Sequence, residues 1–274
     1  RNKNQQTEPI KSESNIVWGS NPIVSMLACS SLFLSRYQDF LQKSNKSRIN
    51  LLTAGSKNPD VAVLLQFSLI LILYVLNILF QHETHRIRKD RENFYPFVFT
   101  DTRGLEEQNG VSENDIKLAL MGHVKEGYQY NPVSPLSAAD PGYNSTPSID
   151  DRVHVLVCVC SAWYSHMRPS ILQKMMSIRE AASDLGIPQL AVLTNIDCEC
   201  SETEKSLRNV YRSKYFQKRM RDFSSSLGIP MNRILPVKNY SHETQLDPDV
   251  DTLILNALRR MIDFGDDYAE KLST

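Results

Sequence analysis

The stretch from Phe94 to Glu107 reads FYPFVFTDTRGLEE, an apolar run that ends in Asp-Thr-Arg-Gly and then turns acidic. Its apolar part, PFVFT, predicts a short buried strand. A strand that delivers an aspartate and a glycine at its carboxyl end can present an Asp-x-x-Gly loop to magnesium and a terminal phosphate. Asp101 and Gly104 are therefore candidate nucleotide-binding residues, and Asp101 is a candidate magnesium ligand.

Downstream of this stretch, strand patterns alternate with helix patterns. The first predicted elements are a helix through 115–124, with Ser112 as its N-cap, and a strand over Val153–Cys160. A second helix follows, with an apolar stripe at Ile171, Met175, Ile178, Ala182 and Leu185, and Gly186 ends it. The remaining predicted elements are a strand over 189–194, a helix from about 204 to 227, a strand over 232–237 and a helix that begins at Asp247 and Pro248. This order predicts an α/β fold, in which right-handed crossovers build a parallel sheet with helices on both faces. The stretch 128–148 is rich in Pro, Ser, Asn and Gly and predicts a long surface loop, either functional or mobile.

Polar residues follow three of the predicted strands, and parallel strands present their carboxyl ends at one edge of a sheet. These residues are Asp101, Gly104, Thr194, Asn195, Asp197, Lys238 and Asn239. Together the three loops outline a guanine nucleotide site, with one carboxylate for magnesium and a cradle for the base. Asp197 would accept two N–H bonds from guanine, and a charge-assisted bond of this kind contributes about 1.5–3 kcal/mol.

Charge and cysteine content narrow the class of protein. Lys plus Arg equal Asp plus Glu at 31 each, so the composition gives no argument for a nucleic-acid partner. The five cysteines include two C-x-C pairs without framework spacing, which favours an intracellular, reducing compartment. Cys158 and Cys160 share one face of a core strand, so packed thiols are favoured over a metal site, and the six histidines show no metal spacing.

Residues 61–80 read VAVLLQFSLILILYVLNILF, an uncharged run long enough to span a bilayer, and the basic sequence HRIRKDR follows shortly after it. Taken alone, this run is a transmembrane candidate. Residues 1–20 are polar and predict a flexible tail.

From Thr84 to about Leu272 the chain resembles the interferon-induced protein 44 and 44-like family. The resemblance is carried by THRIRK, FYPFVFTDTRGLEE, GYQYNP, DRVHVLVCV, LTNID, NYSHETQLDPDVDTLILNALRRM and DFGDDYAE. It implies a P-loop NTPase fold, in which the loop from Thr194 to Asp197 stands where ordinary GTPases carry Asn-Lys-x-Asp. It also implies GTP or GDP with Mg²⁺ as ligands and an interferon-linked, cytoplasmic role in antiviral defence or restraint of growth.

The Gly-rich phosphate loop that this family should carry upstream is absent from the sequence. Aligning SSLFLSRYQDFLQ with the family's first helix sets Ser30 at the magnesium-binding hydroxyl, as a nucleotide and metal ligand. The glycine positions then fall on Ile23 and Ala28, and the lysine position falls on Cys29. A β-branched residue, a Cβ and a neutral thiol at these places predict weak phosphate binding.

The same alignment divides the chain into a flexible tail (1–20), a degenerate N-terminal part of the GTPase-like domain (21–83) and the main body of that domain (84–274). The apolar run 61–80 then interrupts the segment between the first helix and the second strand. A membrane span there would separate that helix from the sheet that it must cover. An aberrant insertion is therefore favoured over a membrane anchor, and a helix packed on the domain remains a third alternative.

Two main functions follow from these observations. The first is a guanine-nucleotide-binding protein of the interferon-induced innate immune response. The second is a nucleotide-free pseudo-GTPase that serves as an interaction module for protein partners of innate immune signalling. A membrane-tethered variant is a third, if 61–80 is an anchor. No residue is predicted to catalyse hydrolysis, and the basic stretch 209–221 is either a solvated helix face or a surface for an acidic partner or a membrane.

Overall fold

The computed structural model describes residues 24–31, 81–89, 92–102, 104–105, 110–162, 168–240, 243 and 245–273. One sheet of six strands lies at its centre, in the order β2-β3-β1-β4-β5-β6. The strands are β1 (Val24–Ser31), β2 (Glu83–Arg88), β3 (Phe94–Asp101), β4 (Val155–Ser161), β5 (Gln189–Thr194) and β6 (Ile234–Pro236). Only β2, at one edge, runs antiparallel to its neighbour in this sheet.

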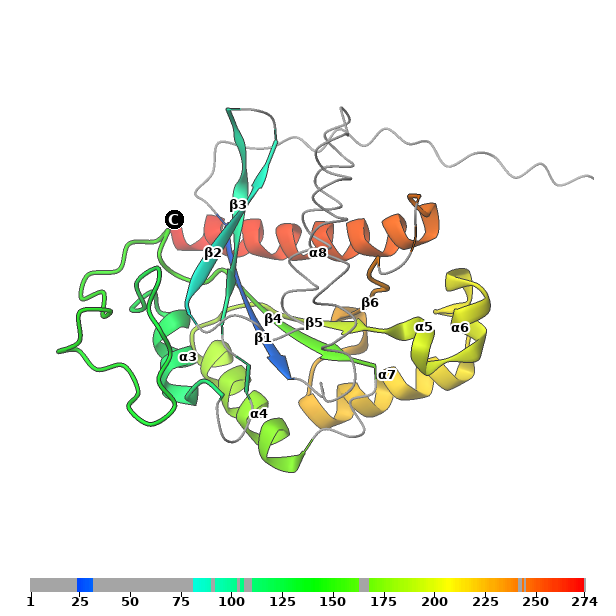
Figure 1. The fold of residues 1–274 in the computed structure, drawn as a ribbon, viewed down its shortest axis with the longest axis horizontal. Coiled ribbons are helices and arrows are strands. Elements are labelled where there is room, and N and C mark those ends of the chain that lie inside the picture. The colour runs from blue at the N-terminus through cyan, green and yellow to red at the C-terminus, as the bar shows by residue number, and fades with distance from the viewer. Residues whose placement is uncertain are drawn as a thin grey trace, which may run out of the picture.

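Helices cover both faces of this sheet. They are α3 (Glu113–Leu120), α4 (Pro169–Asp184), α5 (Ile196–Glu199), α6 (Ser201–Lys205), α7 (Lys214–Leu227) and α8 (Pro248–Ser273), with short 3-10 helices η2 (Leu207–Asn209) and η3 (Met231–Arg233). Figure 1 shows α8 along one side of the sheet and α3, α4 and α7 along the other. The predicted α/β fold, with a parallel sheet between two layers of helices, is confirmed.

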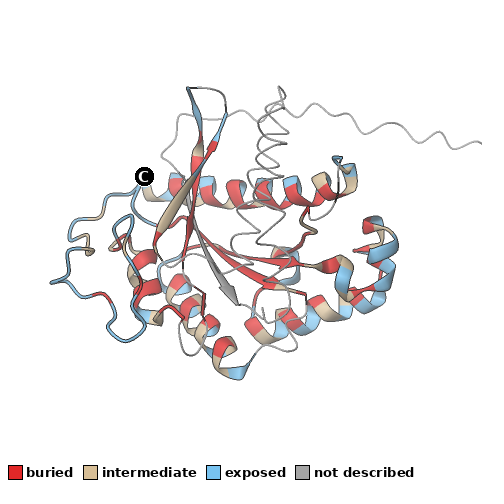
Figure 2. Cartoon of the chain, viewed as in Figure 1, coloured by how far each residue is buried: buried red, intermediate tan, exposed pale blue. Residues whose placement is uncertain are grey.

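The central strands form the core because nearly every residue in them is apolar. β4 reads VLVCVCS and β5 reads QLAVLT, and the side chains of both are buried along almost their whole length. Strands that are buried on both faces lack the alternation of apolar and polar residues that half-exposed strands show. Figure 2 shows this buried centre, with exposed residues on the outer faces of the helices, in the loops and at the outer end of the β2–β3 pair.

Two cysteines belong to this buried centre. Cys158 and Cys160 are free thiols with relative exposures of 2% and 1%, which confirms the expectation of packed thiols. Burial raises the pKa of Cys158 to about 12. Among the residues described, no group of three or more His, Cys, Asp or Glu side chains could hold a metal ion.

Most helix ends lie where the sequence places them. The Ser112 hydroxyl accepts a hydrogen bond from the Asn114 amide at 3.1 Å and caps α3, which ends at Leu120 and is shorter than predicted. Gly186, at φ 73°, follows α4, and Leu185 is exposed because that helix has already ended. Asp247 caps α8 through its carboxylate, which accepts from the Asp249 amide at 2.8 Å.

The single helix predicted from about 204 to 227 is wrong. The structure has α6, η2 and α7 in its place, because Ser206 and Ser213 both adopt extended backbone conformations. The Ser213 hydroxyl then accepts from the Phe216 amide at 3.3 Å and starts α7 as its N-cap. A serine hydroxyl that bonds to a nearby amide competes with a continuous helix at this position.

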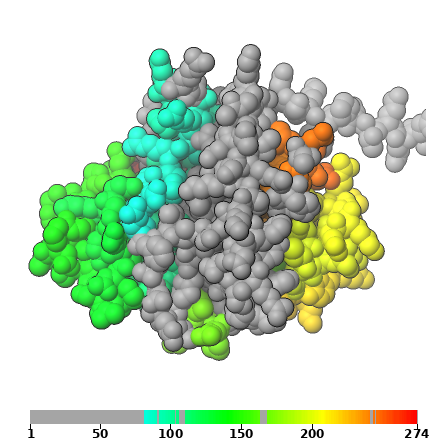
Figure 3. Space-filling view, viewed as in Figure 1, coloured from blue at the N-terminus to red at the C-terminus, as the bar shows by residue number. Residues whose placement is uncertain are grey.

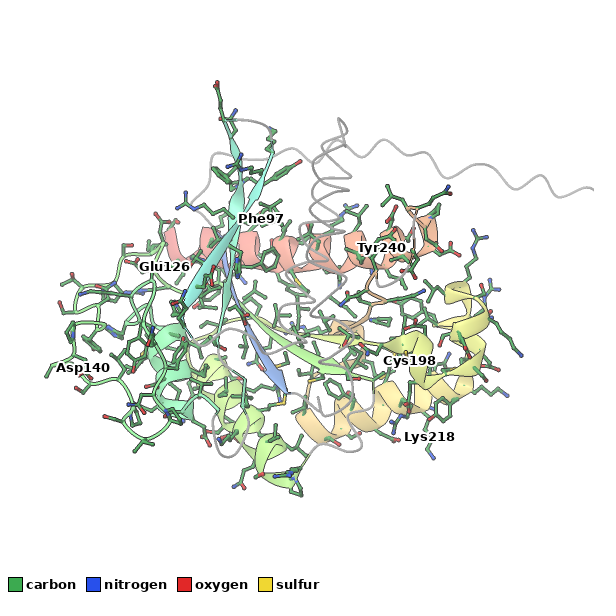
Figure 4. The ribbon with its side chains drawn as sticks, in the orientation of Figure 1. Phe97, Glu126, Asp140, Cys198, Lys218 and Tyr240 are labelled. Carbon is green, nitrogen blue, oxygen red and sulfur yellow. The ribbon has the colours of Figure 1, made fainter. Side chains whose placement is uncertain are left out.

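The stretch 128–148 contains no helix or named strand, as predicted, but side chains hold it against the domain. The buried Asp115 carboxylate on α3 accepts from the Leu136 amide at 2.8 Å, and Asp140 accepts from both the amide and the hydroxyl of Ser137. The ring of Tyr143 stacks on His123 with centroids 5.0 Å apart. Figure 4 shows Asp140 at the outer edge of this loop.

The tail 1–20 and the apolar run 61–80 lie outside the described residues, so the hypotheses about them stay predictions. Across the part of the chain that the structure does describe, no helix combines the length and the apolar character needed to cross a bilayer. The longest of these helices, α8, carries charged residues along its length.

Candidate functional site

The carboxyl ends of the parallel strands meet at one edge of the sheet. Across this edge, Asp101 in β3 pairs with Ala28 in β1, and Ser161 in β4 pairs with Thr194 in β5. The loops that follow β3, β5 and β6 therefore leave the sheet from the same side. All the candidate residues named from the sequence, apart from Ser30, lie at or just after these strand ends.

The start of the loop after β5 is held by a hydrogen bond to the neighbouring strand β4. The Thr194 side chain is buried, and its hydroxyl donates to the carbonyl oxygen of Cys160 at 3.3 Å. Asn195 adopts the left-handed conformation, at φ 58° and ψ 35°, which asparagine tolerates better than most residues. This sharp turn lets α5 begin at once, so that Asp197 lies in the first turn after the strand. No other non-glycine residue in the described chain has a positive φ.

The loops after β5 and β6 meet through Lys238. Its ammonium nitrogen lies 3.8 Å from Asp197 Oδ2 and 2.7 Å from Glu243 Oε1. All three side chains are largely buried, with relative exposures between 15% and 24%. Burial alone would lower the pKa of Lys238, but the hydrogen bond and charge of Glu243, together with Asp197, raise it above its usual value. Lys238 therefore stays charged and holds the two loops together.

Asn239 brings a second acceptor to the loop after β6. Its side-chain oxygen is buried and has no hydrogen-bond partner within the described structure. A buried polar atom without a partner is rare in a native protein, and it calls for a missing ligand or water. The site therefore combines a carboxylate with an unsatisfied amide oxygen, and both accept hydrogen bonds.

A buried ion pair supports the loop after β5. Arg219 on α7 pairs with Glu199 on α5 at 2.6 Å, and it also donates to the carbonyl oxygen of Ala162 after β4 at 3.2 Å. The hydroxyl of Tyr215 donates to the same Glu199 carboxylate at 2.8 Å. These contacts join α7, α5 and the end of β4 close to Asp197.

The sequence analysis missed Glu199, Arg219 and Glu243. These side chains reach the site from three separate segments. Glu243 lies within one of the stretches that carry the family resemblance, but no spacing in the sequence indicates that any of the three belongs to the site. The first two act on the loop after β5 and the third acts on Lys238.

An open hollow of about 420 Å³ lies beside Glu243 at the start of α8, and its other lining residues are Arg208, Gln245, Leu246, Asp247, Pro248 and Asp249.

Asp101 lies at the other end of the site. Its carboxyl group is 3% exposed, and Oδ1 has no partner in the described structure. Burial, opposed by a hydrogen bond from the Thr102 amide and reinforced by Glu83, raises its pKa to about 8. Gly104 is also buried, and its carbonyl oxygen accepts from the Val111 amide at 2.8 Å. Three strand spacings separate β3 from β5, so these residues lie about 14 Å from the loop of Asp197.

The proposed position of the phosphate loop is wrong. Residues 24–31 form β1, which pairs with β3 on one side and β4 on the other, with Ala28 opposite Asp101 and Ser30 opposite Val159. Ser30 therefore lies in a strand and not at the first turn of a helix. The physical reason is that VSMLACSS is mostly apolar or small and carries no glycine to open a loop, so it fills the centre of the sheet. Ile23 is outside the described residues.

A magnesium ion would find one fitting protein ligand among the described candidates. Oδ1 of Asp101 is a hard, buried oxygen without a described hydrogen-bond partner, and magnesium prefers hard oxygen ligands. Among the described residues, Asp101 belongs to no group of three or more side chains that could hold a metal ion. Magnesium commonly keeps several waters and takes one or two carboxylates together with phosphate oxygens. Asp101 would therefore hold such an ion only in company with a phosphate-bearing ligand.

The fold and this edge define an α/β protein of the kind that holds ligands where parallel strands end. A comparison with models of protein families finds no match. Against curated proteins, the chain is 32% identical to interferon-induced protein 44 of Homo sapiens over 195 residues, which are 70% of this chain and 44% of that protein. It is 31% identical to interferon-induced protein 44 of Mus musculus over 194 residues, which are 70% and 46% of the two chains.

The match to interferon-induced protein 44-like of Homo sapiens is 34% identical over 181 residues, 65% of this chain and 40% of that protein. The chain therefore belongs to the interferon-induced protein 44 and 44-like family, as the resemblance of its motifs predicts. It spans less than half the length of these relatives. Among solved structures, a probable GTP-binding protein engB covers 88% of this chain and 99% of its own at 10% identity, with a TM-score of 0.38, a likeness too low to inform function.

Proposed function

We propose that this chain is the GTPase-like body of an interferon-induced protein and that it binds a guanine nucleotide at the carboxyl edge of the sheet. The base lies against the loops after β5 and β6, beside Asn195, Asp197, Lys238 and Asn239, and the buried Thr194 supports the first of these loops from the end of β5. The observation that carries the proposal is the pairing of the Asp197 carboxylate, held beside Lys238 at 3.8 Å, with the unsatisfied oxygen of Asn239 in the same loop as Lys238. Guanine offers two N–H donors on one edge, and a carboxylate accepts both.

The phosphates extend from the base toward the end of β3, where Gly104 and Asp101 lie. The separation of about 14 Å between the two ends of the site suits a ligand as long as a nucleotide. When bound there, Mg²⁺ would neutralise phosphate charge and would also supply the cation that the buried carboxyl group of Asp101 lacks.

A titration with fluorescent GDP and GTP, with and without Mg²⁺, tests this proposal on purified chain whose folding is first verified by circular dichroism. Asp197→Ala removes the base acceptor, and Asp222→Ala, an exposed change on α7, is the matched control. We expect saturable binding that Asp197→Ala weakens at least about tenfold, the effect of losing about 1.4 kcal/mol. Equal binding by the two variants, or equal competition by ATP and GTP, would contradict a guanine site at this loop.

One observation favours a second function, that of a nucleotide-free pseudo-GTPase. The central strand β1 contains no glycine, and the sequence offers none between Gly19 and Gly55, so the usual Gly-rich cradle for phosphates does not follow this strand. Absence of binding by a folded chain that retains the Asp197–Lys238 contact would support this function. The domain would then act as an interaction module.

The biological setting is part of the same proposal. The relatives are named as interferon-induced proteins, and this chain matches less than half of their length. We infer a role in the innate immune or antiviral response, in the cytoplasm, with protein partners of innate immune signalling. Induction of the transcript by interferon and the distribution of a tagged chain in cells test these two points separately.

A further inference from the structure

Opposite charges gather in two separate parts of this chain, although the whole chain is neutral. Residues 205–221 contain seven Lys or Arg and no Asp or Glu, a charge of +7. Residues 243–270 contain eight Asp or Glu and two Arg, a charge of −6. We call the exposed cations of the first part the basic surface: Lys205, Arg212, Lys214, Lys218 and Arg221. We call the exposed acids near the end of α8 the acidic surface: Asp263, Asp266, Asp267 and Glu270.

The basic surface is arranged unfavourably for an isolated molecule. Lys214 is the first residue of α7, and no acidic residue lies in the first turn, so cations gather at the positive end of the helix dipole. Lys218 and Arg221 follow at spacings of four and three residues and share the face of Lys214. The opposite face is buried through Phe216, Met220 and the rest of the apolar stripe. Within the described chain, no acidic side chain pairs with any of the five cations.

The acidic surface shows the same mismatch with the opposite sign. Asp266, Asp267 and Glu270 lie in the last turns of α8, at the negative end of its dipole. Asp263 with Asp267, and Asp266 with Glu270, place like charges four residues apart. Burial and then the charges of these neighbours raise the pKa of Asp266. Arg259 pairs with Asp263 at 3.9 Å, and Lys271 is the basic residue in the last turn of the helix, so the acids of this surface still outnumber the cations beside them.

The two surfaces lie too far apart to neutralise each other within one molecule. Figure 1 shows the end of α8 at the upper left and α7 at the lower right, on opposite sides of the sheet. Figure 4 shows Lys218 directed outward at the lower right edge. In Figure 3 the segment around residues 200–220 forms the right edge of the molecule. Each surface is therefore available to a partner.

We propose that the basic surface of one copy of this chain docks on the acidic surface of a second copy. Such a contact relieves the dipole mismatch of both helices at once, whereas an anionic membrane would satisfy the basic surface alone. Zero net charge also leaves no long-range repulsion between copies. The rings of Tyr211 and Tyr215, 51% and 49% exposed, lie among the cations and add the aromatic contact that protein interfaces favour.

The symmetry of this contact follows from its two different surfaces. A patch that binds an unlike patch makes a heterologous, head-to-tail interface. A dimer of this kind therefore has a free basic surface at one end and a free acidic surface at the other. We therefore expect concentration-dependent growth beyond the dimer, in place of a closed twofold pair.

Charge exchange tests the proposal with two variants of the full chain. The first reverses the basic surface with Lys214→Glu, Lys218→Glu and Arg221→Glu, and the second reverses the acidic surface with Asp263→Lys, Asp266→Lys and Asp267→Lys. Sedimentation velocity at about 50 mM and about 500 mM NaCl should show association of the native chain only at the lower salt, since exposed ion pairs are screened at the higher. Each variant alone should associate at least about tenfold more weakly, and an equimolar mixture of the two should associate again.

Recovery in the mixture is decisive, because a misfolded variant could not restore the contact. If a triple variant fails to fold by circular dichroism, the single exposed changes Lys218→Glu and Asp267→Lys replace it in the same mixture. A native chain that stays monomeric at low salt, or a mixture that does not reassociate, overturns the proposal. Co-sedimentation of a monomeric native chain with phosphatidylserine vesicles would also overturn it and assign the basic surface to a membrane.

Discussion

At the scale of single residues, the molecule keeps a carboxyl group in a place that disfavours its charge. Asp101 is 3% exposed, has one oxygen without a described partner, and has a pKa of about 8. An acid whose pKa is higher in the folded than in the unfolded chain binds more protons when folded. Its contribution to stability therefore falls as the pH rises from about 4 to about 8.

Asp101→Asn should remove this pH dependence. The amide keeps the shape of the side chain but carries no charge to bury, so the variant should be more stable than the native chain at pH 8, by on the order of 2 kcal/mol. The advantage should shrink toward pH 5, where the native carboxyl group is already protonated. Thermal unfolding at both pH values, without Mg²⁺, measures the difference. Asp222→Asn, on the exposed face of α7, is the control and should show the same pH dependence of stability as the native chain. A melting temperature of the native chain that does not change from pH 5 to pH 8 would contradict the prediction.

At the scale of elements, the candidate site depends on how α7 is attached to its neighbours. Arg219 joins this helix to α5 and to the end of β4, with side-chain exposures of 16% for Arg219 and 11% for Glu199. Removing one partner of a buried pair leaves the other charge without compensation.

Arg219→Met should lower the free energy of unfolding by about 3 kcal/mol, because it strands the Glu199 carboxylate beside Tyr215 alone. Arg221→Met is the matched control, since it removes the same charge from an exposed position two residues on. Urea unfolding followed by circular dichroism compares them. Equal stability of the two variants would mean that the ion pair does not hold the helix.

The turn that ends α3 provides a second test at this scale. Gly122 has a φ of +83°, and an added Cβ would lie 2.8 Å from the backbone oxygen of Asp151. Gly127 has a similar φ of +79°, but nothing lies within 4 Å of its added Cβ. An alanine at either position is strained by the positive φ, but only the alanine at position 122 also clashes with backbone atoms.

Gly122→Ala should therefore destabilise the chain by about 2–4 kcal/mol, and Gly127→Ala by about 1 kcal/mol. Thermal or urea unfolding of the two variants in parallel measures the difference, which isolates the steric contact from the backbone strain. Similar losses in both would show that the segment around Asp151 moves aside.

At the scale of the whole molecule, the sequence predicts the order of elements better than their contacts. The parallel sheet, α3, α4 and α8 follow from apolar periodicity and from caps such as Ser112 for α3, Gly186 for α4 and Asp247 for α8, which are local signals. The break before α7 was missed because the hydrogen bond from the Phe216 amide to the Ser213 hydroxyl competes with a continuous helix, and the outcome of that competition depends on packing. Residues 24–31 were assigned to a phosphate loop and not to a strand, because β1 pairs with β3 and β4, which are distant in sequence. Asp197 and Lys238 were found because they follow strands, whereas Glu243 and Arg219 owe their roles to tertiary contacts alone.

The unequal charge distribution gives a prediction at this scale. Near pH 7 and at about 20 mM salt, the native chain should be retained by both cation-exchange and anion-exchange resins despite its zero net charge, because each resin contacts one surface within a Debye length. Lys214→Gln, Lys218→Gln and Arg221→Gln together should abolish retention on the cation exchanger and preserve it on the anion exchanger. Passage of the native chain through both columns would show that its charges are not segregated.

Cys198, next to Asp197, gives the molecule a built-in chemical reporter. Of the four cysteines whose side chains are described, it alone is exposed. Burial and then the negative charge of Asp197 raise the pKa of its thiol, while Lys238 opposes them. A ligand whose N–H groups bond to the Asp197 carboxylate weakens the effect of its charge on the thiol, so we expect occupancy of the loop to change the rate of maleimide addition at mildly alkaline pH. The thiol thus converts an event at the edge of the sheet into a rate that a spectrophotometer can follow, with no label on the ligand.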